Sequence, residues 1–138
     1  GSYNEYLQLA EYGLRPDDTY LLHFSDYGYD LPEDGLYVTD EFYQAHPDII
    51  PKLVRASIRG WEWANEHKEK ALDIVHENNI GTNRYHQRKM MEEILRLQVD
   101  KSCNKRTYLL SPEDFESASD ILLNGLEREN IHYTDFVK

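Results

Sequence analysis

Residues 32–67, PEDGLYVTDEFYQAHPDIIPKLVRASIRGWEWANEH, decide the fold. An acidic turn leads into a short apolar run, and Thr39 or Asp40 follows as a cap for the short helix DEFYQAH. Pro47 suits the first turn of a longer helix. Apolar residues then recur at spacings of three and four, which predicts one inward face made of Ile50, Leu53, Val54, Ser57, Ile58, Trp61 and Ala64.

The two tryptophans of this stretch have different expected roles. Residues two apart in a helix point about 200° apart, so Trp61 and Trp63 cannot both face inward. Trp61 continues the apolar face and is expected in the core. Trp63 is expected to be exposed or to cover a second surface.

Before and after this stretch, the spacing of apolar residues predicts mostly helices. We expect a helix over 4–13 that stops at Gly13, helices over 68–79 and 84–100, and a helix over 111–126 with a Ser cap and Pro at its first position. The inward side chains of the middle two helices are expected to be Ala71, Leu72, Val75, Met90, Met91, Ile94, Leu95 and Leu97. Residues 101–110 form a polar connection.

Two short apolar runs, TYLLHF at 19–24 and GLYVTD at 35–40, predict buried strands, with His23 as a satisfied core residue. Two or three strands are too few for a sheet, because an apolar strand needs neighbours at both edges. The predicted fold class is therefore α/β, mostly helical, and only part of a complete domain.

Composition narrows the function classes. The 138 residues carry a formal net charge of -11, which argues against nucleic acid and against an anionic membrane surface as partners. No apolar run approaches the ~18 residues of a membrane span, so direct membrane insertion is not expected. Gly1-Ser2 is typical of an expression-tag scar, and we expect the natural amino terminus, with any signal peptide, to precede it.

Catalytic and metal-binding motifs are absent from the pattern. The six histidines show no metal-ligand spacing, and the acidic loop 26–34 lacks the calcium-loop pattern, so neither a metal nor another cofactor is expected. The single cysteine, Cys103, lies among basic residues that would lower its pKa, but no histidine base is marked for it. We therefore predict no catalytic residue.

The best candidate for a ligand site is the start of the chain, YNEY at 3–6. Aromatic faces beside an amide and a carboxylate suit a planar, hydrogen-bonding ligand, which points to Tyr3, Asn4 and Glu5. The alternative is an ordinary helix start with Asn4 as its cap.

The stretch GLYVTDEFYQAHPDIIPKLVRASIRGWEWANEHKEKALDIV, together with the preceding YNEYLQL and DYGYD and the closing YLLSPEDFESASDILLNGL, resembles the nitrate/sulfonate/taurine substrate-binding proteins. The branch with thiamine-pyrimidine-precursor binders and fungal thiamine-pyrimidine synthases is the most similar. The matching positions are Gly35, Val38, Glu41, Pro47, Leu53, Val54, Ala56, Gly60, Trp61, Ala64, Ala71 and Val75.

This resemblance implies the carboxyl-terminal portion of a type II periplasmic-binding-protein fold. Within a partial substrate-binding domain spanning 1–138, residues 1–2 would be the tag scar, 3–40 the crossover helix and strands, and 41–138 the carboxyl-terminal helices. Tyr3, Asn4, Glu5 and, more weakly, Tyr27 would contact a small-molecule ligand. An ABC permease or a fused signalling domain would be the partner, in a periplasmic or extracellular location.

Three functions follow as hypotheses. The first is a non-enzymatic solute-binding module of an ABC importer or a ligand sensor. The second is an enzyme like the thiamine-pyrimidine synthases, although their cysteine-rich motif is missing here, since Cys103 stands alone. The third is an interaction domain that forms a homodimer through its unpaired strand edges.

Overall fold

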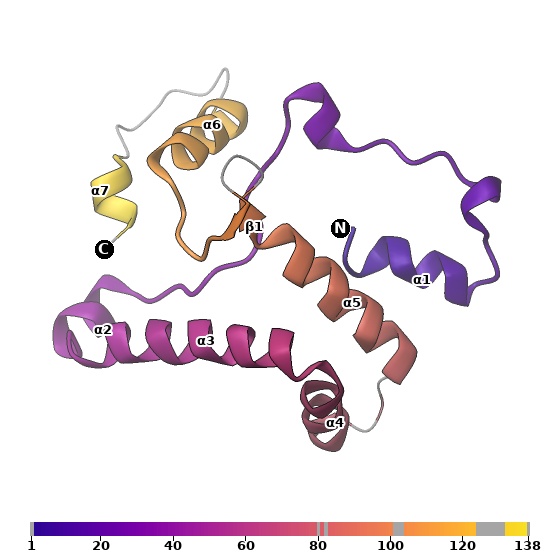
Figure 1. The fold of residues 1–138 in the computed structure, drawn as a ribbon. Coiled ribbons are helices and arrows are strands. Elements are labelled where there is room, and N and C mark those ends of the chain that lie inside the picture. Colours follow the sequence, from indigo (N-terminus) through magenta and orange to yellow (C-terminus); the bar gives the residue numbers. More distant parts are fainter. Residues whose placement is uncertain (1, 80, 82, 101–103, 124–131, 138) are drawn as a thin grey trace. The chain divides into compact units, whose positions relative to one another are not determined.

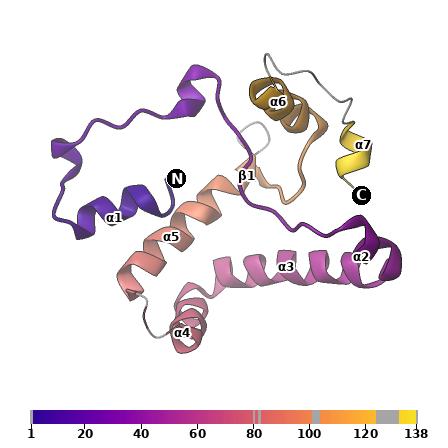
Figure 2. The ribbon, with the colours of Figure 1, turned by 180° about the vertical axis from the view of Figure 1, so that it is seen from behind.

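The computed structural model describes residues 2–79, 81, 83–100, 104–123 and 132–137. The chain divides into two compact units, one made of residues 1–19 and 36–108, the other of residues 20–35 and 109–138. Figures 1 and 2 show the described part of each unit as helices joined by long connections. The two units are described separately below.

The described residues of the first unit form five α-helices. They are α1 (Glu5–Glu11), α2 (Asp40–Ala45), α3 (Ile49–Glu66), α4 (Lys68–Asn78) and α5 (Arg84–Leu97), with the 3-10 turn η1 (Pro16–Asp18) after α1.

Side-chain caps fix where two of these helices, α2 and α5, begin. Thr39 Oγ1 accepts from the Phe42 amide at 3.2 Å, and Asn83 Oδ1 accepts from the Tyr85 and His86 amides at 2.9 and 3.2 Å. The predicted cap at Thr39 and the helix end before Gly13 are confirmed.

The start of α3 differs from the expectation. Pro47 lies two residues before the helix, and the helix begins at Ile49. Pro51 instead occupies the third helical position. A proline is tolerated there because the amides of the first turn have no carbonyl partner within the helix.

The core of this unit lies between α4 and α5. Its buried residues are Ala71, Leu72, Met91 and Leu95, and Trp61 and Ala64 of α3 pack against them. Leu72 is only 2% exposed. The core role of Trp61 and the exposure of Trp63 are both confirmed. Leu53, Val75 and Leu97 were expected to face inward, and that expectation is wrong because each remains more than two-fifths exposed.

The two predicted strands are wrong. Residues 20–23 and 35–39 have no regular structure, Phe24–Tyr27 form the 3-10 turn η2, and Asp40 already begins α2. Among the described residues, neither run has a strand beside it, so its backbone forms no ladder and its apolar side chains stay accessible. His23 is accordingly exposed rather than a core residue.

The one ladder of the described chain was not expected: its first strand replaces the end of the helix predicted over 84–100, which stops at Leu97, and its second lies in the expected polar connection. Strands β1 (Val99–Asp100) and β2 (Lys105–Arg106) pair antiparallel, with Val99 opposite Arg106. Asn104 precedes β2 with φ of 53°, a left-handed conformation that Asn tolerates in turns. The expectation of a mostly helical chain is confirmed, and the periplasmic-binding fold remains a prediction.

The second unit contains η2, α6 (Pro112–Leu123) and α7 (Tyr133–Phe136). Ser111 Oγ accepts from the Asp114 amide at 3.0 Å, which confirms the predicted Ser cap with Pro112 at the first position. Buried Phe115 meets the edge of the Tyr133 ring at 5.7 Å, and the Tyr133 hydroxyl donates to the Leu110 carbonyl at 2.7 Å. The last residues predicted for this helix, 124–126, lie outside the described residues.

Candidate ligand groove

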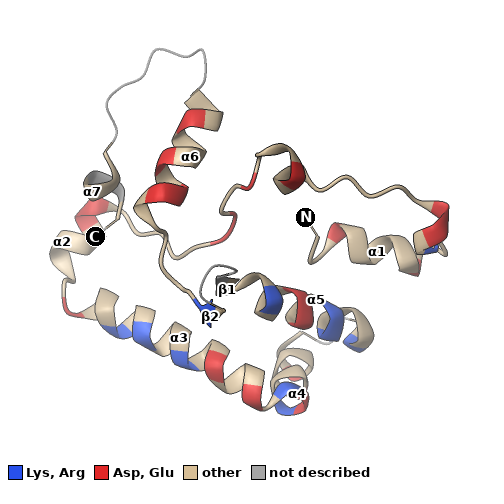
Figure 3. Cartoon of the chain, turned by 45° about the horizontal axis from the view of Figure 1, so that its top comes forward, with Lys and Arg blue, Asp and Glu red and all other residues tan. Residues whose placement is uncertain are grey.

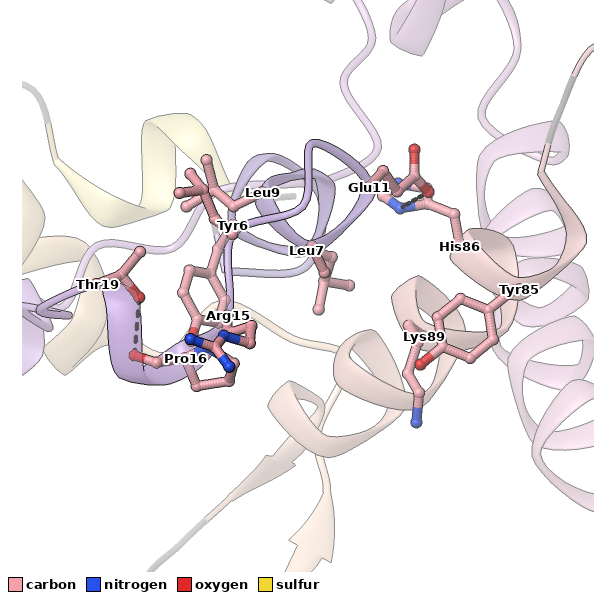
Figure 4. Close-up of a pocket in the computed structure, with 12 residues that line it drawn as sticks. Tyr6, Leu7, Leu9, Glu11, Arg15, Pro16, Thr19, Tyr85, His86 and Lys89 are labelled. Atoms are coloured by element: carbon pink, nitrogen blue, oxygen red, sulfur yellow. Dashed lines mark hydrogen bonds and ion pairs between the residues drawn. The ribbon is translucent and has the colours of Figure 1, made fainter.

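A groove of about 390 Å³ lies between α1, η1 and α5, all within the first unit (Figure 4). Most of its wall is apolar, and two tyrosines, Tyr6 and Tyr85, add aromatic rings. Its polar side chains are Glu11, Arg15, Thr19, His86 and Lys89; its aliphatic side chains are Leu7, Leu9, Ala10, Leu14 and Pro16. In Figure 4, Arg15 and Pro16 lie at one end of the groove, and Tyr85 and Lys89 at the other.

The end of α1 shapes one wall of the groove. Gly13 adopts φ of 84°, a left-handed conformation that ends the helix at no steric cost. The Leu14 amide then donates back to the Leu9 carbonyl at 3.1 Å. Beyond it, the Arg15 guanidinium pairs with Asp18 at 3.2 Å and lowers the pKa of that carboxyl. These contacts fold residues 13–18 back beside α1.

His86 is the polar centre of the site. Its side chain comes from the first turn of α5 and is only 8% exposed as a residue. Its Nδ1 lies 3.2 Å from Glu11 Oε1, and its Nε2 lies 3.0 Å from Asn4 Oδ1. Both oxygens are acceptors, and Asn4 Oδ1 also accepts from Gln8 Nε2 at 3.2 Å. The His86 ring is therefore held from two sides, by Asn4 before α1 and by Glu11 at the end of α1.

Lys89 lies one turn further along α5, at the end of the groove away from Arg15 (Figure 4). Its ammonium lies 5.9 Å from the centroid of the Tyr85 ring and 3.1 Å from Glu92 Oε2. The hydrogen bond to Glu92 raises the pKa of Lys89, so the ammonium stays charged at neutral pH. The groove therefore combines apolar walls with the Lys89 ammonium and the His86 imidazole from α5 and the Glu11 carboxylate from α1.

Residues 1–71 match the protein family described as NMT1/THI5 like, which is just over half of the chain. The chain belongs to the NMT1/THI5-like family. No curated protein and no solved structure matches it. The matched residues include α1, η1 and α3 but not α5, so the resemblance is confirmed for 1–71 and remains a prediction for 72–138.

The predicted ligand contacts of this NMT1/THI5-like chain do not line the groove. Tyr3, Asn4 and Glu5 stand together at the start of α1, where Asn4 Nδ2 donates to Glu5 Oε1 at 3.3 Å. Asn4 occupies the N-cap position without a side-chain cap, and it reaches the groove only through His86. Tyr27 belongs to η2 in the second unit and is 64% exposed. Direct contact of these four residues with a ligand stays a prediction.

Sequence reasoning missed His86 and the groove itself. His86 and Asn4 are 82 residues apart in sequence, and no spacing motif links an Asn cap to a histidine on a distant helix. The Asn83 cap locates the start of α5 but says nothing about what α5 contacts. Cys103, the other candidate considered, lies outside the described residues. Within the described ranges, no group of three His, Cys, Asp or Glu side chains is arranged to hold a metal.

No helix in the described part of the chain has the length and apolar character needed to cross a bilayer.

Proposed function

We propose that this chain is part of a non-enzymatic module that binds a small solute, and that the solute occupies the groove between α1 and α5. One observation carries the proposal: an apolar groove with two tyrosine rings contains a buried histidine fixed from two sides. Ligand sites commonly combine apolar walls with a few fixed polar groups that set orientation. Substrate binding is also the role that the family suggests.

The groove chemistry suits a planar ring that carries hydrogen-bonding groups. Tyr6 and Tyr85 offer aromatic faces for stacking, and the Glu11 carboxylate would accept from an amine on the ring. Lys89 would meet an anionic or electron-rich edge. A thiamine pyrimidine precursor has this combination of features. In this proposal Asn4 acts mainly by holding His86, while Tyr3, Glu5 and Tyr27 are outer candidates for contact.

The parent protein would be the solute-binding component of an ABC importer or a ligand-sensing protein, acting in the periplasm or outside the cell. The missing part of such a domain would supply the second wall of the site and close over the ligand. The chain alone should therefore bind weakly.

Titration calorimetry with a thiamine pyrimidine, taurine and nitrate tests this proposal. We expect micromolar or weaker binding of the preferred ligand, and about a tenfold loss when Tyr85→Ala removes one stacking face. Tyr20→Ala is the matched control, since Tyr20 is 88% exposed and lies in the other unit. Nanomolar binding would contradict a half-site, and equal losses in both variants would place the ligand elsewhere.

The synthase-like alternative makes a different prediction. It requires iron retained by the purified protein and a pyrimidine product detectable by mass spectrometry. Detection of both would overturn the non-enzymatic proposal.

A further inference from the structure

One face of α3 is exposed and carries no contact with the core of its unit. A hollow of about 470 Å³ on this face is lined by Ala56, Arg59, Gly60, Glu62, Trp63 and Glu66. All six residues are exposed. A Cβ placed on Gly60 would meet no atom within 4 Å, so the space above the helix backbone is open. The large Trp63 ring stands one turn beyond this gap and stacks on His67 at 4.8 Å.

The charges along this face are ordered. Arg55 and Arg59 lie on the amino-terminal side of the hollow, and Glu62 and Glu66 lie on its carboxyl-terminal side. Figure 3 shows this order as blue followed by red along α3. Among the ion pairs that the described residues form, none involves these four side chains. Residues 55, 59, 62 and 66 are spaced by three or four positions, so their side chains form one stripe along α3. This stripe runs beside the small residues Ala56 and Gly60.

We propose that α3 binds α3 of a second copy of this chain in an antiparallel, two-fold symmetric pair. In such a pair the charged stripe of one helix lies beside the charged stripe of the other, and the two stripes run in opposite directions. Arg59 then faces Glu62 of the second copy, and Arg55 faces Glu66 of the second copy. Both pairs form in the same register, in which the two-fold axis passes between Gly60 and Trp61 of each helix. A parallel two-fold pair would instead place the two charged stripes on opposite sides of the interface, so Arg59 would not face Glu62 of the second copy.

The same register also fills the hollow. In this register Trp63 lies opposite residue 58 of the second copy. Residue 58 lies between Ala56 and Gly60 along the helix. The indole can therefore enter the gap above these two small residues, and by symmetry each copy contributes one such ring. The interface consequently combines a buried aromatic anchor with charges that fix its direction. This pairing differs from the strand-edge dimer, because it needs no strand.

Sedimentation equilibrium of the purified chain over a range of concentrations tests the pairing. We expect a monomer–dimer equilibrium. Arg59→Glu should raise the dimer dissociation constant about tenfold, because two attractive pairs become repulsive. Gly60→Leu should weaken the dimer at least as much, because the new side chain occupies the space of the indole. Circular dichroism reports whether each variant keeps its helices.

Two further variants make the test specific. The double variant Arg59→Glu/Glu62→Arg recreates the pair with reversed polarity and should restore dimerisation to within a few-fold of the original chain. Lys70→Glu, an exposed residue of α4, makes the same charge change away from this face and should leave the dimer intact. A purely monomeric chain would overturn the proposal. A dimer that resists Arg59→Glu and Gly60→Leu, or one that the double variant fails to restore, would overturn it as well.

Discussion

Helix α5 has two contact surfaces that differ in chemistry. Toward α4 it presents Met91 and Leu95, which enclose Leu72 and Ala71 in the core. Toward α1 it presents His86, which is buried but polar and which borders an open groove. The first contact is apolar and closed, and the second is polar and leaves a cavity beside it.

The difference separates stability from recognition. Apolar burial is non-directional, so the α4–α5 contact stabilises the unit without fixing any one atom. A buried polar group costs free energy unless its partners are placed correctly, so the contacts of His86 with Asn4 and Glu11 fix a geometry. A site for a small ligand needs that second property. The three predictions below test this division.

The largest effect is expected at the centre of the apolar contact. Leu72→Ala removes a side chain that is only 2% exposed and should lower the free energy of unfolding by about 2–5 kcal/mol. Urea denaturation followed by circular dichroism measures this loss. Ile74→Ala is the control on the same helix, because Ile74 is 51% exposed and should cost much less. An equal loss of unfolding free energy in the two variants would contradict the position of the core between α4 and α5.

A smaller effect is expected at the polar contact. His86→Ala removes the contact that ties Asn4 Oδ1 and Glu11 Oε1 to α5, and should cost about 1–3 kcal/mol. The loss should concentrate in α1, so hydrogen exchange should accelerate for the amides of residues 8–11 more than for those of α4.

The matched control for that variant is His76→Ala. His76 is exposed on α4, and its replacement should change stability by less than about 0.5 kcal/mol. Unchanged exchange in α1 after the loss of His86 would contradict the division between the two surfaces.

The parts of the chain that the sequence predicted well are those governed by local rules. Thr39 and Ser111 cap helices through contacts within three residues, and a periodic face identifies Trp61 as a core residue. These signals need no knowledge of distant contacts. The end of α1 before Gly13 follows from similar local chemistry.

The failures share the opposite cause. An apolar run such as 19–24 becomes a strand only if another strand pairs with it, and the described chain offers none. The inward role of Val75 failed because amphipathic spacing defines a face, while the neighbouring helices decide how much of that face is covered. The contact between Asn4 and His86 depends on how α1 packs on α5, which no local pattern encodes. The candidate site therefore emerged only from the structure.

The smallest effect is expected at the exposed edge of the apolar contact. Glu69 of α4 pairs with Arg88 and, at 3.4 Å, with Arg84 of α5, and the hydrogen bond from Arg88 lowers the pKa of Glu69 below its ordinary value of 4.5. A carboxyl whose pKa is lowered by folding contributes stability above its unfolded pKa, and that contribution is lost as pH falls through the folded value. Glu69→Gln should therefore lower the melting temperature slightly at pH 7 and flatten its decline below pH 4.5. Glu77→Gln, an exposed position on the same helix, should leave the acid decline unchanged. If both variants melt like the original chain from pH 7 to pH 3, the ion pairs add nothing and the apolar side chains alone hold α4 against α5.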